Sequence, residues 1–294
     1  MSEVIVPQKG EGFVAGVKRD RQGKEKPMSM SRGNAPQQGG AYTTMFEGFR
    51  DELDEHHDRR MRIGKVSRDV TALSKKIIFS LQRVRKLSQP IPTHIQKDID
   101  QRLQEIATQL KEIEPDVQGM NRYRYPLICL EEFVEGVSFA HYLRHQTLMT
   151  PAQAQDALLP VNIHLTAPDY VFGIFDLTGE MMRFATAVTA LSGSMPTGQK
   201  NLEDDADKSG ADDDQGGQRS ILTDMQDVSS MLHICPTVGK PGTYAKKLSI
   251  MIEQVRKVEL VGYGVTVRGN ERPKGWIPDL SEAAGGDGED TAMT

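Results

Sequence analysis

The sequence predicts an all-α fold, a bundle of about seven helices of which the first is very long. Apolar residues recur at steps of three and four through most of the chain from residue 42 onward, which is the period of a helix. Few segments show the period of two that strands require. From residue 42 onward, all prolines up to the last helix except Pro126 fall at or beyond the ends of the periodic segments, as expected where helices begin and end.

The first predicted helix covers residues 42–87, which contain no proline. Pro90 and Pro92 follow and end it. One face is apolar and the opposite face is rich in Lys and Arg, as in an amphipathic helix. The apolar stripe consists of Ile63, Val66, Val70, Leu73, Ile77, Leu81, Val84 and Leu87.

The remaining helices follow from start and stop signals. Thr93 with Gln96 forms a predicted capping box, and Thr150 before Pro151 is a predicted N-cap followed by proline at the first helical position. Pro126 predicts either a kink in the third helix or a late start to it. Gly269 is the predicted C-cap of the last helix. The predicted spans are 93–114, 120–148, 150–159, 168–192, 219–232 and 244–268.

Composition separates a helical domain from three polar segments. Residues 1–40 have no sustained apolar period and are expected to form a disordered N-terminal arm. The helical domain is assigned to residues 41–280, with a disordered acidic insertion at 193–218 and an acidic disordered tail at 281–294. The formal net charge of −5 is misleading, because the insertion and the tail hold the acidity while the helical body is mildly basic. A mildly basic helical domain is compatible with nucleic-acid binding but does not require it.

Composition also bears on the compartment. No apolar run approaches the ~20 residues of a transmembrane helix, and no secretory signal pattern opens the chain. The two cysteines, Cys129 and Cys235, suit a reducing compartment better than a disulfide framework. We therefore expect a cytoplasmic and nuclear protein.

Two short acidic motifs lie within otherwise apolar helices. They are Glu132-Phe-Val-Glu135 and Asp176-Leu-Thr-Gly-Glu180. On a helix, spacings of three and four put each pair on one face. Two such helices packed together would gather four carboxylates, which is costly unless a cation lies between them. Hard divalent cations bind oxygen ligands, so the motifs predict a metal site. The competing interpretation is a pair of ordinary solvated helix faces.

Other metal chemistries fit the sequence less well. Position 138 is Ser, so the Glu-x-x-His motif of di-iron helix bundles is missing. No Cys and His spacing suits zinc. We therefore expect Mg²⁺ or Mn²⁺, either as one ion with a carboxylate base or as two ions.

Several blocks of the chain resemble the translin family. The resemblance covers residues 42–192 and 219–280, in the family's order. The N-terminal arm and the acidic insertion have no counterpart in it. The blocks are EGFRDELDEHHDRR and GKVSRDVTALSKKIIFSL in the first helix, EEFVEGVSFAHYL in the third, DYVFGIFDLTGEMMR in the fifth and KVELVGYGVTVRGNERPK near the end.

The resemblance implies an activity and a partner. In this family a nuclease subunit pairs with translin in a closed, hollow hetero-oligomer that encloses RNA, and translin supplies most of the shell. The nuclease subunit's catalytic carboxylates match Glu132, Glu135, Asp176 and Glu180, whereas translin lacks the first three. The resemblance therefore implies a Mg²⁺- or Mn²⁺-dependent endoribonuclease subunit with a translin-like partner. Its expected substrate is single-stranded or short RNA, and single-stranded DNA is a further candidate ligand.

Within this hypothesis the four acids take separate roles. Glu132, Glu135 and Asp176 are expected to bind the metal directly, and Glu180 is expected to be a ligand or to position the attacking water. Gly173 and Gly179 would allow close approach of a helix or of the substrate, and simple helix packing explains them at least as well.

Two alternatives to this hypothesis stay open. In the first, the chain is a structural, nucleic-acid-binding subunit that stabilises translin. In the second, it is a scaffold that binds other proteins through its acidic insertion. The basic face of the first helix likewise has two interpretations, RNA phosphate contact or pairing with acids of the same helix. The residues proposed for RNA contact are Arg59, Arg62, Lys65 and Arg68.

Overall fold

The computed structural model describes residue 40 and residues 42–198 and 219–268. Within these ranges the chain forms eight α-helices and one 3₁₀-helix and contains no strand, so the predicted all-α fold is confirmed. Most of the predicted arm, insertion and tail, together with Gly269, lies outside the described residues. None of the described helices is long and apolar enough to cross a membrane.

The helices follow the predicted order. The predicted third helix begins late, because Tyr125 and Pro126 separate a single turn from the main helix. The bounds are α1 (Thr43–Leu81), α2 (Thr93–Ile113), η1 (Glu114–Val117), α3 (Asn121–Arg124), α4 (Cys129–His145), α5 (Pro151–Asp156), α6 (Ala167–Ser192), α7 (Ile221–Ile234) and α8 (Pro241–Arg268).

The chain divides into two compact units, residues 1–53 and 54–294, and the boundary falls within α1. In the described part of the first unit, the exposed rings of Phe46 and Phe49 meet edge to face with their centroids 6.0 Å apart. The second unit contains the helices that carry both acidic motifs.

The predicted end of the first helix at residue 87 is wrong, since α1 ends at Leu81. The Val84 amide donates to the Leu81 carbonyl at 2.9 Å, which tightens the chain into a turn. The Ser88 amide then donates to the Leu143 carbonyl of α4 at 3.0 Å. Val84 and Leu87 are buried all the same. The apolar period therefore continues beyond the helical backbone, and this continuation misled the prediction.

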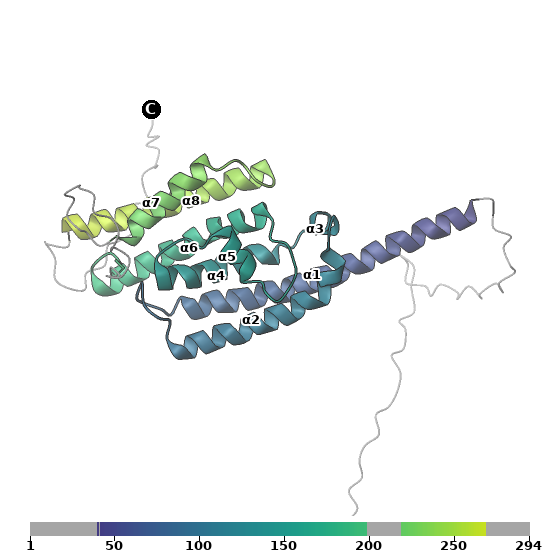
Figure 1. Ribbon diagram of the computed structural model, residues 1–294. Coiled ribbons are helices and arrows are strands. Elements are labelled where there is room, and N and C mark those ends of the chain that lie inside the picture. The colour runs from purple at the N-terminus through teal and green to yellow at the C-terminus, as the bar shows by residue number, and fades with distance from the viewer. Residues whose placement is uncertain (1–39, 41, 199–218, 269–294) are drawn as a thin grey trace, which may run out of the picture. The chain divides into compact units, whose positions relative to one another are not determined.

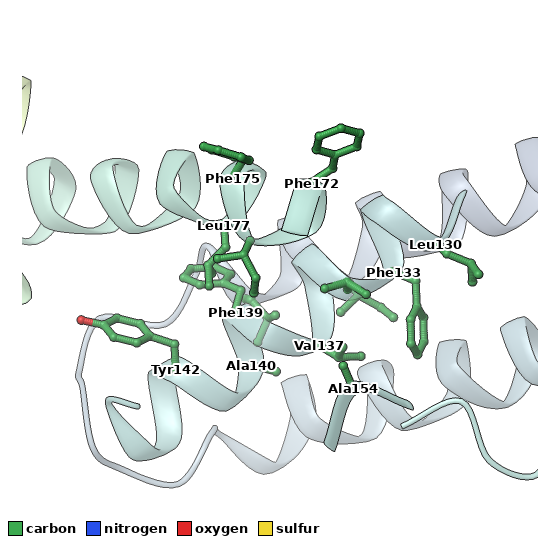
Figure 2. Packing of buried hydrophobic residues seen from close by; sticks show 14 of the residues in the cluster. Leu130, Phe133, Val137, Phe139, Ala140, Tyr142, Ala154, Phe172, Phe175 and Leu177 are labelled. Atoms are coloured by element: carbon green, nitrogen blue, oxygen red, sulfur yellow. The ribbon is translucent and has the colours of Figure 1, made fainter. Parts of the chain in front are cut away.

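Within the second unit the helices form layers (Figure 1). The α1 segment of this unit lies beside α2, α4 and α6 pack against each other in the middle, and α7 and α8 cover α6. The core is continuous through these layers and includes Cys129, which is fully buried. Figure 2 shows Leu177 of α6 pointing toward Phe139 of α4, while Phe172 and Phe175 point to the opposite side of α6. There Phe175 meets the ring of Tyr244 of α8 edge to face, with 5.2 Å between centroids.

The N-terminus of α6 is fixed by buried polar contacts. Thr166 and Asp169 form a capping box, in which the Asp169 carboxylate accepts from the Thr166 amide at 2.8 Å. The same carboxylate pairs with the guanidinium of Arg122, and both residues are buried. Arg122 also donates to the His164 carbonyl at 2.9 Å. These contacts fix the start of the helix that carries the second acidic motif.

Candidate functional site

The two acidic motifs meet where α4 and α6 cross. At this crossing a β-carbon added to Gly173 would lie 2.7 Å from Cβ of Val134 and 2.8 Å from the Glu131 carbonyl oxygen. Only glycine fits so close a helix contact. Gly173 therefore serves helix packing, the simpler of its two predicted roles, and Gly179 faces the side-chain amide of Gln254 of α8 instead. The close crossing brings the acids of α4 next to those of α6.

Glu135 is the most deeply set carboxylate of the first motif, with 9% of the residue exposed. Among the described residues, none donates a hydrogen bond to its side chain and none forms an ion pair with it. Burial raises the pKa of Glu135 to about 8, and the neighbouring carboxylates of Asp176, Glu132 and Glu180 add to the rise. The other three predicted acids therefore lie close enough to Glu135 to affect its carboxyl.

Glu180, on α6, is also buried, with 6% of the residue exposed. Gln82, in the turn after α1, donates its side-chain amide to Glu180 Oε2 at 2.7 Å. Glu180 Oε1 lies 3.7 Å from Nε of Arg183, one turn along α6. One carboxylate oxygen is thus held by a neutral donor, while the other has only a long contact with a cation.

The other two acids are paired with lysines. Lys75 of α1 places Nζ 3.2 Å from Glu132 Oε1. Lys247 of α8 places Nζ 2.7 Å from both carboxylate oxygens of Asp176. It also lies 3.6 Å from Oε2 of Glu131, a fifth acid at this site. Burial raises the pKa of Glu131, and the Lys247 ammonium opposes that rise.

A hard divalent cation fits the donor chemistry of this cluster. The donors are carboxylate oxygens, and the buried Glu135 carboxylate has three acids near it and no hydrogen-bond donor within residues 42–198 and 219–268. The arrangement does not yet enclose an ion. In the part of the chain that the structure describes, no three His, Cys, Asp or Glu side chains are placed to hold one. Two of the four predicted ligands are instead bound by lysines.

A cavity of about 170 Å³ opens beside Glu180. Its wall combines two cationic side chains with two aromatic ones, a composition suited to a phosphate and an adjoining base. The residues that line it with Glu180 are Gln82, Arg85, Arg183, Phe139, Phe184 and Ala187.

The predicted RNA-contact residues of α1 divide into two pairs. Arg62 donates to both carboxylate oxygens of Asp116 in η1, at 3.0 and 3.1 Å, and Arg59 donates to one of them at 3.2 Å. Arg59 also pairs with Glu55 one turn earlier on α1. These two arginines fasten α1 to η1, a partner that the sequence did not indicate. Lys65 and Arg68 are exposed.

Sequence reasoning found the four acids but missed Glu131, Gln82, Lys75 and Lys247. For Lys247 a signal existed. It follows Tyr244 by three positions and precedes Met251 by four, so it falls within the apolar stripe of its helix. A lysine at such a position indicates a buried charge that needs a partner.

This geometry defines the class of protein: it is a helical bundle with an acid cluster at the crossing of two helices. The Translin family matches residues 58–269, which is most of the chain. The chain belongs to the translin family, and the predicted resemblance is confirmed.

Relatives in two distant organisms agree with this assignment. The chain is 27% identical to Translin-associated protein X of Rattus norvegicus over 263 residues, covering 80% of this chain and 82% of that protein. It is 28% identical to a Translin-associated protein X homolog of Schizosaccharomyces pombe over 230 residues, covering 76% and 87%. Both relatives are named Translin-associated protein X, so the similarity is to this branch of the family, as expected, and not only to translin itself.

A solved structure titled "Crystal structure of AfC3PO" is also similar, with a TM-score of 0.48 and 15% sequence identity. The similarity covers 76% of this chain and 98% of that one.

Proposed function

We propose that this chain is the metal-dependent endoribonuclease subunit of a hetero-oligomer with a translin-like partner. It hydrolyses phosphodiester bonds in single-stranded or short RNA. The observation that carries the proposal is Glu135, a buried carboxylate that has no donor among the described residues and lies near three other acids of α4 and α6. The relatives named Translin-associated protein X support the choice of partner.

In this proposal three of the acids bind a cation and the fourth acts on the attacking water. Glu132, Glu135 and Asp176 would hold Mg²⁺ or Mn²⁺, which when bound would lower the pKa of a water and shield the phosphate charge. Glu180 keeps one oxygen on Gln82 and uses the other to orient the attacking water or to accept its proton. Because Gln82 is neutral, it fixes Glu180 without neutralising it.

The cavity beside Glu180 is the proposed place for the substrate. Arg183 and Arg85 line it and provide cationic donors for RNA phosphate oxygens. Phe139 and Phe184 supply apolar wall area for a base. A substrate held there would lie next to the acid cluster, because Glu180 belongs to both. The proposed settings are removal of a nicked strand from small-RNA complexes and trimming of tRNA precursor leaders, in the cytoplasm and nucleus.

A second candidate is a structural subunit that binds nucleic acid without cutting it. The ion pairs of Glu132 with Lys75 and of Asp176 with Lys247 favour it, because lysine contacts of this kind are also expected of acids that only stabilise the helix packing.

A cleavage assay separates the two candidates. The chain is purified with its translin-type partner and given labelled single-stranded RNA in Mg²⁺, in EDTA, and as the Asp176→Asn variant. The nuclease proposal predicts cutting in Mg²⁺ only, and loss of cutting in the variant while assembly and RNA binding persist. RNA binding without cutting in Mg²⁺ or Mn²⁺ would contradict it and favour the structural subunit.

A further inference from the structure

Lys247 extends into the acid cluster from a third helix, α8. Its Nζ lies 2.7 Å from both Asp176 oxygens and 3.6 Å from Glu131 Oε2, and its side chain is only 19% exposed. The ammonium also lies 5.5 Å from the centroid of the Phe172 ring, within the range of a cation–π contact. Two helices therefore supply the acids, and α8 supplies the cation that pairs with Asp176 and Glu131.

We propose that Lys247 is the resident counter-ion of this cluster and competes with the divalent cation for Asp176. In this account α8 sets the cation affinity of a site whose ligands lie on α4 and α6. The inference rests on the proposed function, because it takes Asp176 as a metal ligand.

The competition follows from geometry and charge. Both Asp176 oxygens contact the ammonium, so a cation that binds Asp176 must displace Lys247 or approach it closely. Two positive charges that share one carboxylate repel each other, and the repulsion is strong where the surroundings are only partly hydrated. A divalent cation therefore binds at the expense of the Lys247 contact.

The structure also offers a place for the displaced ammonium. Glu131 Oε2 already lies 3.6 Å from Lys247 Nζ, and a small shift of the lysine side chain would shorten this ion pair to hydrogen-bond distance. The Phe172 ring, whose centroid lies 5.5 Å from the ammonium, offers it a second favourable neighbour by a cation–π contact. Glu131 is accordingly the acceptor of the released lysine rather than a further ligand of the cation.

Lys75 is less suited to this role. It contacts Glu132 at 3.2 Å, but its side chain is 54% exposed. Water screens an ion pair at that exposure, and such pairs contribute little. The effect of Lys247 on cation binding should therefore exceed that of Lys75.

Mn²⁺ titration of the full-length chain, followed by electron paramagnetic resonance of the free ion, tests the proposal. Lys247→Met removes the competing charge. Lys246→Met makes the same charge change at the exposed neighbour on α8, and Lys247→Arg keeps the charge. We expect Lys247→Met to lower the Kd for Mn²⁺ about fivefold or more, as is typical of coupled sites. Lys246→Met and Lys247→Arg should stay close to wild type.

The outcomes distinguish this proposal from the nuclease proposal. If wild type binds Mn²⁺, Asp176→Asn does not, and Lys247→Met binds no more tightly than wild type, only the counter-ion role is overturned. If neither wild type nor Lys247→Met binds Mn²⁺, the metal site and the counter-ion role are both overturned. Lys247→Gln, a polar replacement of similar length, provides the same comparison should Lys247→Met fail to fold.

Discussion

Gly173 on α6 lies so close to Val134 on α4 that a β-carbon at position 173 would stand 2.7 Å from Cβ and Cγ1 of Val134. The next nearest atom is a backbone oxygen, that of Glu131, which cannot rotate away. The separation of the two acid-bearing helices therefore depends on the absence of one methyl group. Cation binding and fold stability should respond together when that group is added.

Gly173→Ala is predicted to push α4 and α6 apart. Overpacking of this kind costs about 1–3 kcal/mol of unfolding free energy. Cleavage should fall with it, because the acids of the two helices separate. Gly64→Ala is the matched control, since the nearest atom to its β-carbon is Arg68 Nη1 at 3.8 Å. Urea unfolding should show this control to be neutral or stabilised by up to about 1 kcal/mol. Equal stability of the two variants would refute the close-contact argument.

Asp169→Asn is predicted to destabilise the chain because it leaves the guanidinium of Arg122 buried without its counter-charge. Removing one partner of a buried pair costs about 3 kcal/mol or more. Asp227→Asn on α7 is the control, because its pair with Arg219 is half exposed and is expected to contribute at most about 1 kcal/mol. Thermal unfolding of both variants measures the difference. A similar fall in Tm for both would contradict a special role for the buried pair.

The stability of the cation-free chain is predicted to fall as pH rises from about 4.5 to 8. In the folded chain the pKa of Glu135 is raised to about 8, so the carboxyl keeps its proton over a range in which the unfolded chain loses it. The folded state then binds more protons than the unfolded state, and raising the pH favours unfolding, by at most about 1.4 kcal/mol per pH unit.

Chemical denaturation in EDTA at several pH values tests this dependence. Glu135→Gln should flatten it and be the more stable protein at pH 8. Added Mn²⁺ should reduce it in wild type, since a bound cation favours the ionised carboxylate. An unchanged slope in Glu135→Gln would show that other groups cause the dependence.

The RNA contact predicted for α1 now centres on Lys65 and Arg68, which are exposed, because Arg59 and Arg62 hold Asp116. Lys65→Ala with Arg68→Ala should weaken RNA binding by the assembled complex and lower the salt slope of log K by up to about two. Arg62→Ala is the control and should leave the slope nearly unchanged. Fluorescence anisotropy across a salt series gives both values. An unaltered slope in the double variant would assign RNA binding to other surfaces.

Much of the architecture was predictable because the helices are amphipathic and proline-bounded. The spacing of the four acids placed each pair on one helix face, and one acid of each pair, Glu135 and Glu180, proved to be buried. The end of α1 was not predictable in the same way. Val84 and Leu87 keep the apolar period because they pack on the core, while the backbone has already left the helix so that Ser88 can bond to Leu143.

The residues that contact the four acids were harder to predict from the sequence. Lys247 and Asp176 are 71 positions apart in sequence, and their contact depends on how α8 packs over α6. Gln82 reaches Glu180 from a turn that the predicted first helix would have made helical. Spacing rules describe one element at a time, so contacts made by a third helix or by a turn fall outside them.

Cleavage by Glu132→Gln tests the central claim most directly. The variant is assembled with its translin-type partner and assayed on labelled single-stranded RNA in Mg²⁺, beside wild type and Glu112→Gln, an exposed acid of α2. The account predicts that Glu112→Gln cuts like wild type, whereas Glu132→Gln assembles and binds RNA but loses cleavage by about a hundredfold or more. Cleavage by Glu132→Gln at the wild-type rate would contradict the assignment of the acid cluster as the nuclease site.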